Sequence, residues 1–351
     1  MEKLIYIKPS NSTFILRDEE ILKKHYDVYS VCLDRSTNQK YLLSAVKLFF
    51  FLIKHSFSAK IYFTRFADYH TVIPAFLKKI FHVPFFVVVG GYDATYIKKY
   101  NYGVFNNKIR AWCARFTYKQ ATCILPISQA LVENTNRFAF EAAFKAGIMH
   151  FVKGLKTPVK VIPNGFKAPE DLGEYGDVKE NIALTVAIVN RKQTYYIKGI
   201  DSFIETAKLL PDYRFIMIGV SMDLIDKLRI KLPENLTVLG PVPQVELNEY
   251  FKKAKVYCVF SISEGMSNAL CEAMVHKCIP VVSEVMVLPE IVDGAGFVVS
   301  KREPKEMAEK VKRAFDADRS MGELAQRRIL SDFSDKKREK QLIQLIDSFL
   351  K

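Results

Sequence analysis

Short runs of apolar residues alternate with longer amphipathic segments along most of this 351-residue chain. A run of four to eight apolar residues is typical of a buried strand, and a longer segment with apolar residues every three or four positions is typical of a helix. Strands that alternate with helices form a parallel sheet covered by helices, because each parallel connection must cross over the sheet. The pattern therefore predicts an α/β protein.

The alternation occurs in two series of similar length, which predicts two doubly wound, Rossmann-like domains. Strands of the first series are expected over residues 3–7, 59–63, 85–89 and 123–126. The second series has expected strands at 182–189, 215–219, 236–239, 256–260 and 279–283, helices at 199–210 and 268–276, and charged helical segments from 303 onward.

A polar stretch with several Gly and Pro, FKAPEDLGEYGDVKEN at residues 166–181, is typical of a linker between the two series. We therefore place the domain boundaries at 1–167 and 168–334. The C-terminal helix, at about 335–351, is a candidate for packing back on the first domain.

Positive charge is concentrated in the first half of the chain. The whole chain has 52 Lys and Arg against 38 Asp and Glu, a net charge of +14. Residues 1–170 hold 25 basic and 11 acidic residues, whereas residues 171–351 hold 27 of each. The excess belongs to the first domain, and a basic surface suits nucleic acid, an anionic membrane or an anionic substrate.

The cysteines and the N-terminus predict a cytoplasmic protein. None of the six cysteines forms a C-x-x-C pair or a metal-type spacing with His, which is typical of buried thiols in a reducing compartment. The first residues, MEKLIYIKPSNSTF, contain too short an apolar run for a signal peptide.

The longest apolar stretch is Leu42–Phe57, and it is interrupted by Lys47, Lys54 and His55. It is shorter than the roughly 20 residues that a spanning helix needs. We interpret it as a buried amphipathic helix in preference to a helix on a membrane surface, which leaves a peripheral membrane location as the alternative.

The strongest local motif is SISEGMSNALCEAMVHKCIPVVS, residues 261–283. Glu264 lies in the loop after a predicted buried strand, and Glu272 lies about one turn inside the next helix. Met266, Ser267, Asn268 and Ala269 lead into that helix, whose free N–H groups favour an anion such as a diphosphate. Two acidic residues beside an anion site are unexpected for phosphate alone, but they are expected if the phosphate carries sugars on both sides.

This segment resembles the E-x7-E signature of family-4 retaining glycosyltransferases of the GT-B fold, through Glu264-Gly265, Glu272-Ala273-Met274 and Pro280-Val281-Val282. It departs from the family at Cys278, where Gly is frequent, and at Ser267-Asn268, where Gly-Leu is frequent. Neither departure affects the two acids.

Other segments resemble the same family, so that the likeness covers about residues 120–300. Arg191 and Lys198-Gly199 resemble the basic segment that holds the donor diphosphate, although their spacing is longer than usual. Gly240-Pro241-Val242 resembles the loop that faces the nucleobase. Two turns also match, Leu125-Pro126-Ile127-Ser128 and Val161-Ile162-Pro163-Asn164-Gly165.

The resemblance implies two Rossmann-like domains that face each other across a cleft and a sugar that is transferred from a UDP- or GDP-sugar with retention. Glu272 would bind the ribose and Glu264 the hydroxyls of the donor sugar, while Lys198 and Arg191 would stabilise the leaving diphosphate. No protein nucleophile is implied. No convincing D-x-D motif is present, since Asp316-Ala317-Asp318 lies in a charged helical region; we therefore expect no metal and no cofactor.

Candidate residues of the first domain follow two of its predicted strands. Gly90 and Gly91 permit a close approach of the backbone to a ligand, and Asp93 is a candidate for a hydrogen bond to an acceptor hydroxyl or the donor sugar. A turn cap is nearly as good an interpretation of Asp93. Asp68 and His70 are further acceptor-side candidates, although a single His is more often structural.

The predicted function is therefore retaining glycosyl transfer to a glycan or lipid-linked acceptor, in the synthesis of surface polysaccharide or glycoconjugate. The basic excess and Phe49-Phe50-Phe51 lie in the acceptor-side domain, which makes the cytoplasmic face of an anionic membrane a candidate partner. The alternatives are a non-catalytic protein on the same fold that binds a membrane or nucleic acid, and a nucleotide-sugar epimerase. No nucleic-acid motif is present, so nucleic acid is not expected as a partner.

Overall fold

The computed structural model describes residues 1–34, 36–139, 143–168 and 179–350. The chain divides into two compact units, which are described separately. Unit 1 comprises residues 1–134, 145–164 and 336–351, and unit 2 comprises residues 135–144 and 165–335. The C-terminal segment thus belongs to the same unit as the first residues. The expected linker at 166–181 lies largely outside the described residues.

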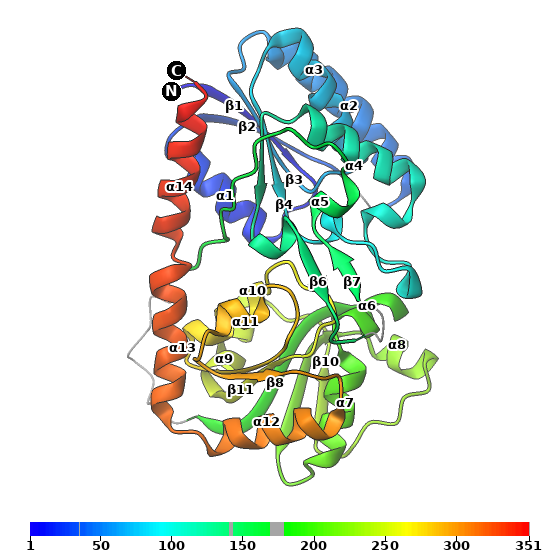
Figure 1. Cartoon of the computed structure of the whole chain (residues 1–351), viewed down its shortest axis with the longest axis vertical. Coiled ribbons are helices and arrows are strands. Elements are labelled where there is room, and N and C mark those ends of the chain that lie inside the picture. Colours follow the sequence, from blue (N-terminus) through cyan, green and yellow to red (C-terminus); the bar gives the residue numbers. More distant parts are fainter. Residues whose placement is uncertain (35, 140–142, 169–178, 351) are drawn as a thin grey trace. The chain divides into compact units, whose positions relative to one another are not determined.

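Unit 1 is built on a five-stranded parallel sheet with the strand order β2-β1-β3-β4-β5 (Figure 1). The three strands β3, β4 and β5 are buried throughout, as expected for strands covered by helices on both faces. The strands are β1 (Lys3–Lys8), β2 (Asp27–Cys32), β3 (Ile61–Arg65), β4 (Phe85–Val89) and β5 (Cys123–Pro126).

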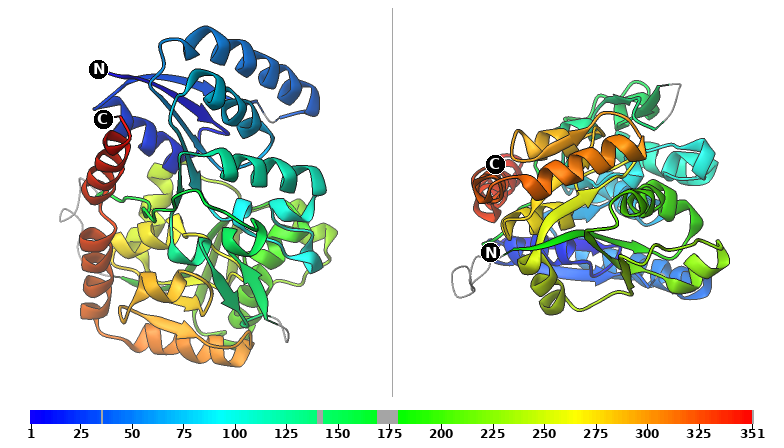
Figure 2. Two further views of the ribbon diagram at one scale, coloured as in Figure 1. Left: turned by 45° about the horizontal axis from the view of Figure 1, so that its top comes forward. Right: turned by 90° about the horizontal axis from the view of Figure 1, so that it is seen from below.

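Helices cover both faces of this sheet, because the connection from β1 to β2 and the later connections run in opposite directions along it. One face carries α1 (Thr13–Lys23) and the C-terminal part of α14 (Asp335–Ser348); Phe349, the residue after α14, contacts Phe86 of the sheet. The other carries α2 (Asn38–Ser56), α3 (Val72–Phe81) and α4 (Lys108–Gln120), which follow one another from blue to green in Figure 2.

A buried cluster of charges joins distant parts of unit 1. The Arg65 Nε lies 2.6 Å from an Asp18 carboxylate oxygen, and the Arg338 guanidinium donates to both oxygens of the same carboxylate at 2.8 and 3.0 Å. Arg338 also donates to the carbonyl oxygens of Ile162 and Pro163, and Arg65 donates to Asn164. Burial raises the pKa of Asp18, but the two guanidinium groups outweigh it and hold that pKa below its usual value.

Unit 2 is built on a six-stranded parallel sheet with the order β10-β9-β8-β11-β12-β13. Its strands are β8 (Glu180–Val189), β9 (Arg214–Val220), β10 (Leu236–Leu239), β11 (Ala254–Val259), β12 (Ile279–Ser283) and β13 (Phe297–Val299). A separate pair, β6 (Asn134–Asn136) and β7 (Phe144–Ala146), forms a two-stranded sheet.

The helices of unit 2 also form two layers. α7 (Ile200–Leu209) and α12 (Pro304–Asp316) pack together on one face, and Figure 2 shows α12, in orange, lying across the sheet. The other face carries α9 (Gln244–Lys253), α10 (Asn268–Val275), α11 (Leu288–Val292) and α13 (Arg319–Asp332). Two doubly wound sheets in one chain confirm the predicted α/β fold.

Candidate functional site

Two loops of unit 2 lie beside each other because their strands are neighbours in the sheet. β8 ends at Val189 and continues into α6 (Lys192–Ile197), and β11 ends at Val259 and continues into the loop before α10. The carboxyl ends of parallel strands share one edge of the sheet, and that edge is where ligands bind in folds of this kind. The connection after β8 includes α6 and carries Lys198 as the C-cap of that helix, and the loop after β11 carries Glu264. These two connections are called the first and the second loop.

A close backbone contact fixes the first loop against the second. Gly199 has a φ of +66°, and a Cβ at this position would lie 2.0 Å from the carbonyl oxygen of Phe260. Only glycine meets both conditions without strain. The N–H of Ile262 donates to the carbonyl oxygen of Ile197 at 2.9 Å. The residue between these contacts, Lys198, is therefore held at the second loop.

The Lys198 ammonium forms an ion pair with the Glu264 carboxylate, with 2.7 Å between Nζ and Oε2. The Glu264 side chain is 10% exposed and the Lys198 side chain 32%, so the pair opens to solvent through the lysine. Ser261 donates from Oγ to the same Glu264 oxygen at 3.3 Å, and its own carbonyl oxygen accepts from Ser283 at 2.6 Å. The motif had not pointed to Ser261 as a partner of Glu264.

The start of α10 lies in the same loop. Ser267 is the N-cap, and its hydroxyl oxygen accepts from the N–H of Leu270 at 3.4 Å. Met266 is buried, whereas Asn268 and Ala269 in the first turn are half-buried. Glu272 is the fifth residue of α10 and is half-buried too. The structure thus places both acids of the motif and the first turn of α10 within one short segment.

The remaining donor-side candidates are more exposed. Arg191 is the N-cap of α6 and is exposed, and Lys198 is the C-cap at the other end of the same helix. Gly240 follows β10, two strands away from β8, and its carbonyl oxygen accepts from the N–H of Gly219 at 3.3 Å. Nothing lies within 4 Å of a Cβ placed at Gly240, and Val242 is half-buried. These residues share the carboxyl edge of the sheet with the ion pair.

Asp93 lies inside unit 1, with 1% of its surface exposed. One carboxylate oxygen accepts from the N–H groups of Gly90 and Gly91, both at 3.0 Å, and the other accepts from the Ala67 N–H at 3.1 Å and the Tyr118 hydroxyl at 2.8 Å. Burial raises the pKa of Asp93 although all four donors act in the opposite direction. This geometry favours the turn-cap interpretation, because the carboxylate organises the glycine loop.

Asp68 and His70 are buried in unit 1 as well. Asp68 receives a forked pair of hydrogen bonds from Arg110, at 3.0 and 2.6 Å, and the His70 Nε2 lies 3.3 Å from the carbonyl oxygen of Arg65. Burial raises the pKa of Asp68, but Arg110 and nearby groups lower it by more than burial raises it. The pKa of Asp68 therefore lies below its usual value. The sequence had not indicated Arg110, which comes from α4 and also donates to the hydroxyl of Tyr92.

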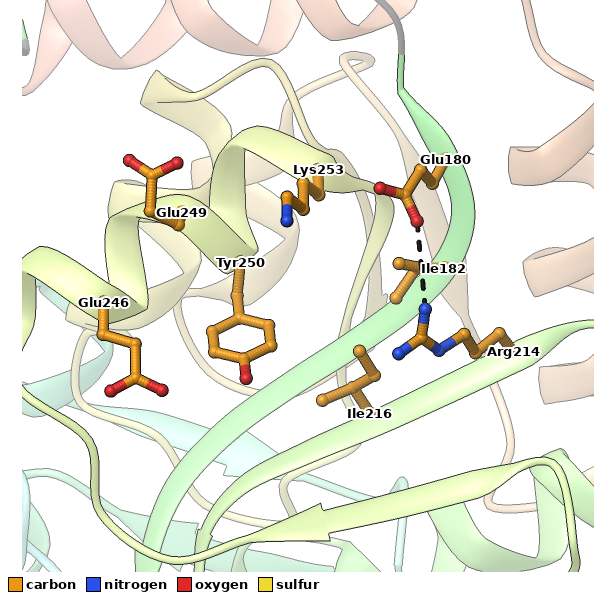
Figure 3. A pocket seen from close by; sticks show the side chains of 8 residues that line it. All are labelled: Glu180, Ile182, Arg214, Ile216, Glu246, Glu249, Tyr250 and Lys253. Carbon is orange, nitrogen blue, oxygen red and sulfur yellow. Dashed lines mark ion pairs between the residues drawn. The ribbon is translucent and has the colours of Figure 1, made fainter.

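A cavity of about 320 Å³ lies elsewhere in unit 2 (Figure 3). Glu180 and Arg214, which form an ion pair at 3.9 Å across it, are the first residues of β8 and β9. The cavity therefore lies at the amino ends of these strands, opposite to the edge that carries Lys198 and Glu264. Its lining contains none of the predicted site residues: Glu180, Ile182, Arg214, Ile216, Glu246, Glu249, Tyr250 and Lys253.

Part of unit 2 matches the model of a known protein family. Residues 183–317, which include Arg191, Lys198, Glu264 and Glu272, match the model of the family described as glycosyl transferases group 1. The chain matches no curated protein sequence.

Solved structures resemble the whole chain. Sucrose-phosphate synthase from Thermosynechococcus elongatus has a TM-score of 0.75 at 14% identity, over 99% of both chains. HepE from Anabaena, solved with UDP and glucose, has a TM-score of 0.70 at 13% identity, over 99% of this chain and 100% of its own. A glycosyltransferase from Rickettsia africae has a TM-score of 0.68 at 15% identity, over 100% and 99%. These similarities establish the fold and confirm the predicted GT-B type.

Proposed function

We propose that this chain, whose residues 183–317 match the glycosyl transferases group 1 family, is a glycosyltransferase that moves a sugar from a nucleotide-sugar donor to a glycan or lipid-linked acceptor with retention at the anomeric carbon. The observation that carries this proposal is the Lys198–Glu264 ion pair beside the first turn of α10. Lys198 supplies a positive charge, Glu264 a carboxylate for sugar hydroxyls, and the N-terminus of α10 a helix dipole that favours phosphate oxygens.

The reaction builds negative charge on the diphosphate as the bond between the anomeric carbon and the phosphate oxygen breaks. Lys198, Arg191 and the first turn of α10 would stabilise that charge, so that no metal is required. The acceptor oxygen forms the new bond to the anomeric carbon, and its proton passes to the leaving phosphate. Glu264 would orient the donor sugar through its hydroxyls and would not act as a nucleophile.

Two further observations support a nucleotide-sugar donor. The solved HepE structure, which this chain resembles over almost its whole length, contains UDP and glucose. Glu272, in α10, is placed one turn beyond the residues proposed for the diphosphate, where a carboxylate can accept from ribose hydroxyls. Surface polysaccharide or glycoconjugate synthesis is the process that we propose for this activity, and the basic residues of the first half favour an anionic or lipid-linked acceptor.

The proposal is tested by a donor screen in which UDP-, GDP- and ADP-sugars are incubated with the enzyme and release of the nucleotide is measured. We expect one donor class to be used, with no loss of rate when a chelator is present. The product of a successful pairing should keep the anomeric configuration of the donor, as NMR would show. Epimerised nucleotide-sugar without nucleotide release would identify an epimerase, and strict loss of activity in chelator would show a metal site.

Glu272→Ala should raise the KM for the donor by about 10- to 100-fold, because one hydrogen bond to a charged group contributes roughly 1.5–3 kcal/mol. The measurement is the initial rate of nucleotide release against donor concentration. Glu309→Ala is the matched control, because Glu309 is an exposed glutamate of α12 in the same unit. Equal KM values for the Glu272 variant and the wild type would remove Glu272 from the donor site.

A further inference from the structure

Helix α2 presents apolar side chains on two opposite faces. Leu48 and Leu52 are fully buried against the rest of unit 1. A second stripe, at spacings of three to four residues, faces outward and consists of Leu42 (67% exposed), Leu43 (61%), Val46 (48%), Phe49 (44%) and Phe50 (65%). The sequence had favoured a helix that is simply buried. A solvated outer face would be polar, so the outer stripe requires a separate explanation.

The neighbouring helices continue this surface. Phe57, which follows α2 and is 83% exposed, contacts Phe81 at the end of α3 with ring centroids 5.0 Å apart. α3 itself exposes Phe76 and Ile80, which are four residues apart and therefore lie on one side of the helix. α4 exposes Ile109 and Trp112 in the same manner. We call the outer surface of these three helices the α2–α4 surface (Figure 1).

The charges of this surface have one sign. Residues 38–120 contain thirteen Lys and Arg but only two acids, Asp68 and Asp93. Nine of the thirteen basic residues belong to the three helices, whereas Arg65 is buried and paired with Asp18 and is not part of the surface. Both acids are buried and accept hydrogen bonds from groups of unit 1. None of the three helices contains Asp or Glu. The exposed lysines Lys47 and Lys54, seven residues apart, flank the apolar stripe of α2.

We propose that the α2–α4 surface docks on an anionic lipid bilayer, with α2 lying in the plane of the membrane interface. The outer stripe would enter the boundary between headgroups and acyl chains, while the flanking lysines extend to the phosphates. No described helix is long and apolar enough to span a membrane. A protein partner would have to bring negative charge to an apolar surface whose three helices contain no acid. A bilayer with anionic headgroups already combines negative charge with an apolar interior.

The biological role of this docking rests on the proposed function, because docking would bring the acceptor-binding unit to a lipid-linked acceptor. Binding to the membrane itself needs neither donor nor catalysis. The two proposals can therefore fail independently.

The test is co-sedimentation of the full-length protein with vesicles of phosphatidylcholine alone, or of phosphatidylcholine and phosphatidylglycerol in equal parts. We expect binding to the anionic vesicles at low salt, weaker binding at high salt, and little binding to the neutral ones. The double variant Leu42→Ser/Phe50→Ser should weaken binding by about tenfold or more, because two exposed apolar side chains no longer enter the interface. Lys47→Glu/Lys54→Glu should weaken it by a similar factor and reduce its salt dependence.

Matched controls come from exposed positions of unit 2. Leu209→Ser/Val245→Ser and Lys305→Glu/Lys312→Glu change the same kinds of residue and should bind like the wild type. Thermal unfolding of every variant checks the fold, and nucleotide release checks the donor site. The proposed docking surface would be overturned if the protein did not bind anionic vesicles, or if the control variants lost as much binding as the α2 variants. It would also be overturned if the α2 variants broke a dimer while vesicle binding persisted. Normal vesicle binding without sugar transfer would instead overturn the proposed function alone.

Discussion

Lys198→Ala is expected to lower kcat by about 10²- to 10³-fold, the usual cost of removing one group that stabilises charge in the transition state. The lysine ammonium lies 2.7 Å from Glu264, and contacts of Gly199 and Ile197 fix the backbone on either side of it. It therefore needs no large rearrangement to meet a leaving diphosphate, and such preorganisation makes a charge effective in catalysis.

The measurement for this variant is nucleotide release at saturating donor, compared with Lys208→Ala. Lys208 is an exposed lysine of α7 that pairs with Glu205, and pairs of this kind contribute little to stability. We expect the Lys208 variant to keep wild-type kcat. A Lys198 variant that retains full kcat would show that the ion pair with Glu264 is structural only, and the proposed catalytic role would be withdrawn.

Arg338→Ala is expected to destabilise unit 1 by roughly 3–5 kcal/mol, since breaking a buried ion pair leaves a charge without compensation. The Arg338 side chain is 3% exposed and the Asp18 side chain 1%. The variant loses both bonds to Asp18 and the two bonds to the carbonyl oxygens of Ile162 and Pro163. Arg338→Lys keeps the charge but lacks the planar fork, and should fall between alanine and wild type.

Denaturant unfolding followed by tryptophan fluorescence suits this variant, because the single tryptophan, Trp112, lies in α4 of unit 1. Arg319→Ala is the control: Arg319 pairs with Glu323 at the surface of α13 and its loss should cost at most about 0.5 kcal/mol. If the two variants unfolded at the same denaturant concentration, the buried cluster would not contribute to the stability of unit 1.

The alternating pattern was enough to predict most of the architecture. The expected strands at 85–89, 123–126, 236–239 and 279–283 agree with the observed bounds, since each is a short run of mostly apolar residues. β2 and β13 were not predicted. β2 mixes exposed and half-buried residues, and β13 is only three residues long, so neither has an apolar run of the length that predicts a strand.

The site was harder to predict because its contacts depend on loops that come together only in the folded chain. The motif gave Lys198 and Glu264 separate roles, whereas the structure joins them directly. Asp93 and Asp68 each follow a strand, as a substrate-binding acid would. The Asp93 carboxylate, however, accepts a hydrogen bond from Tyr118, 25 residues further along the chain, and the Asp68 carboxylate from Arg110, 42 residues further along, both in α4. Nothing in the local sequence around either acid indicates a partner at that distance.

The path of the chain also sets the order in which unit 1 can be completed during synthesis. Asp18, Arg65 and Asn164 emerge early, but Arg338 follows only after residues 165–335, which belong to unit 2. At about 5–20 residues per second, the ribosome takes on the order of ten to thirty seconds to bridge that interval. Throughout it, a nascent unit 1 would hold the Asp18 carboxylate without its second guanidinium, and the face of the sheet that α14 later covers would remain open to chaperones.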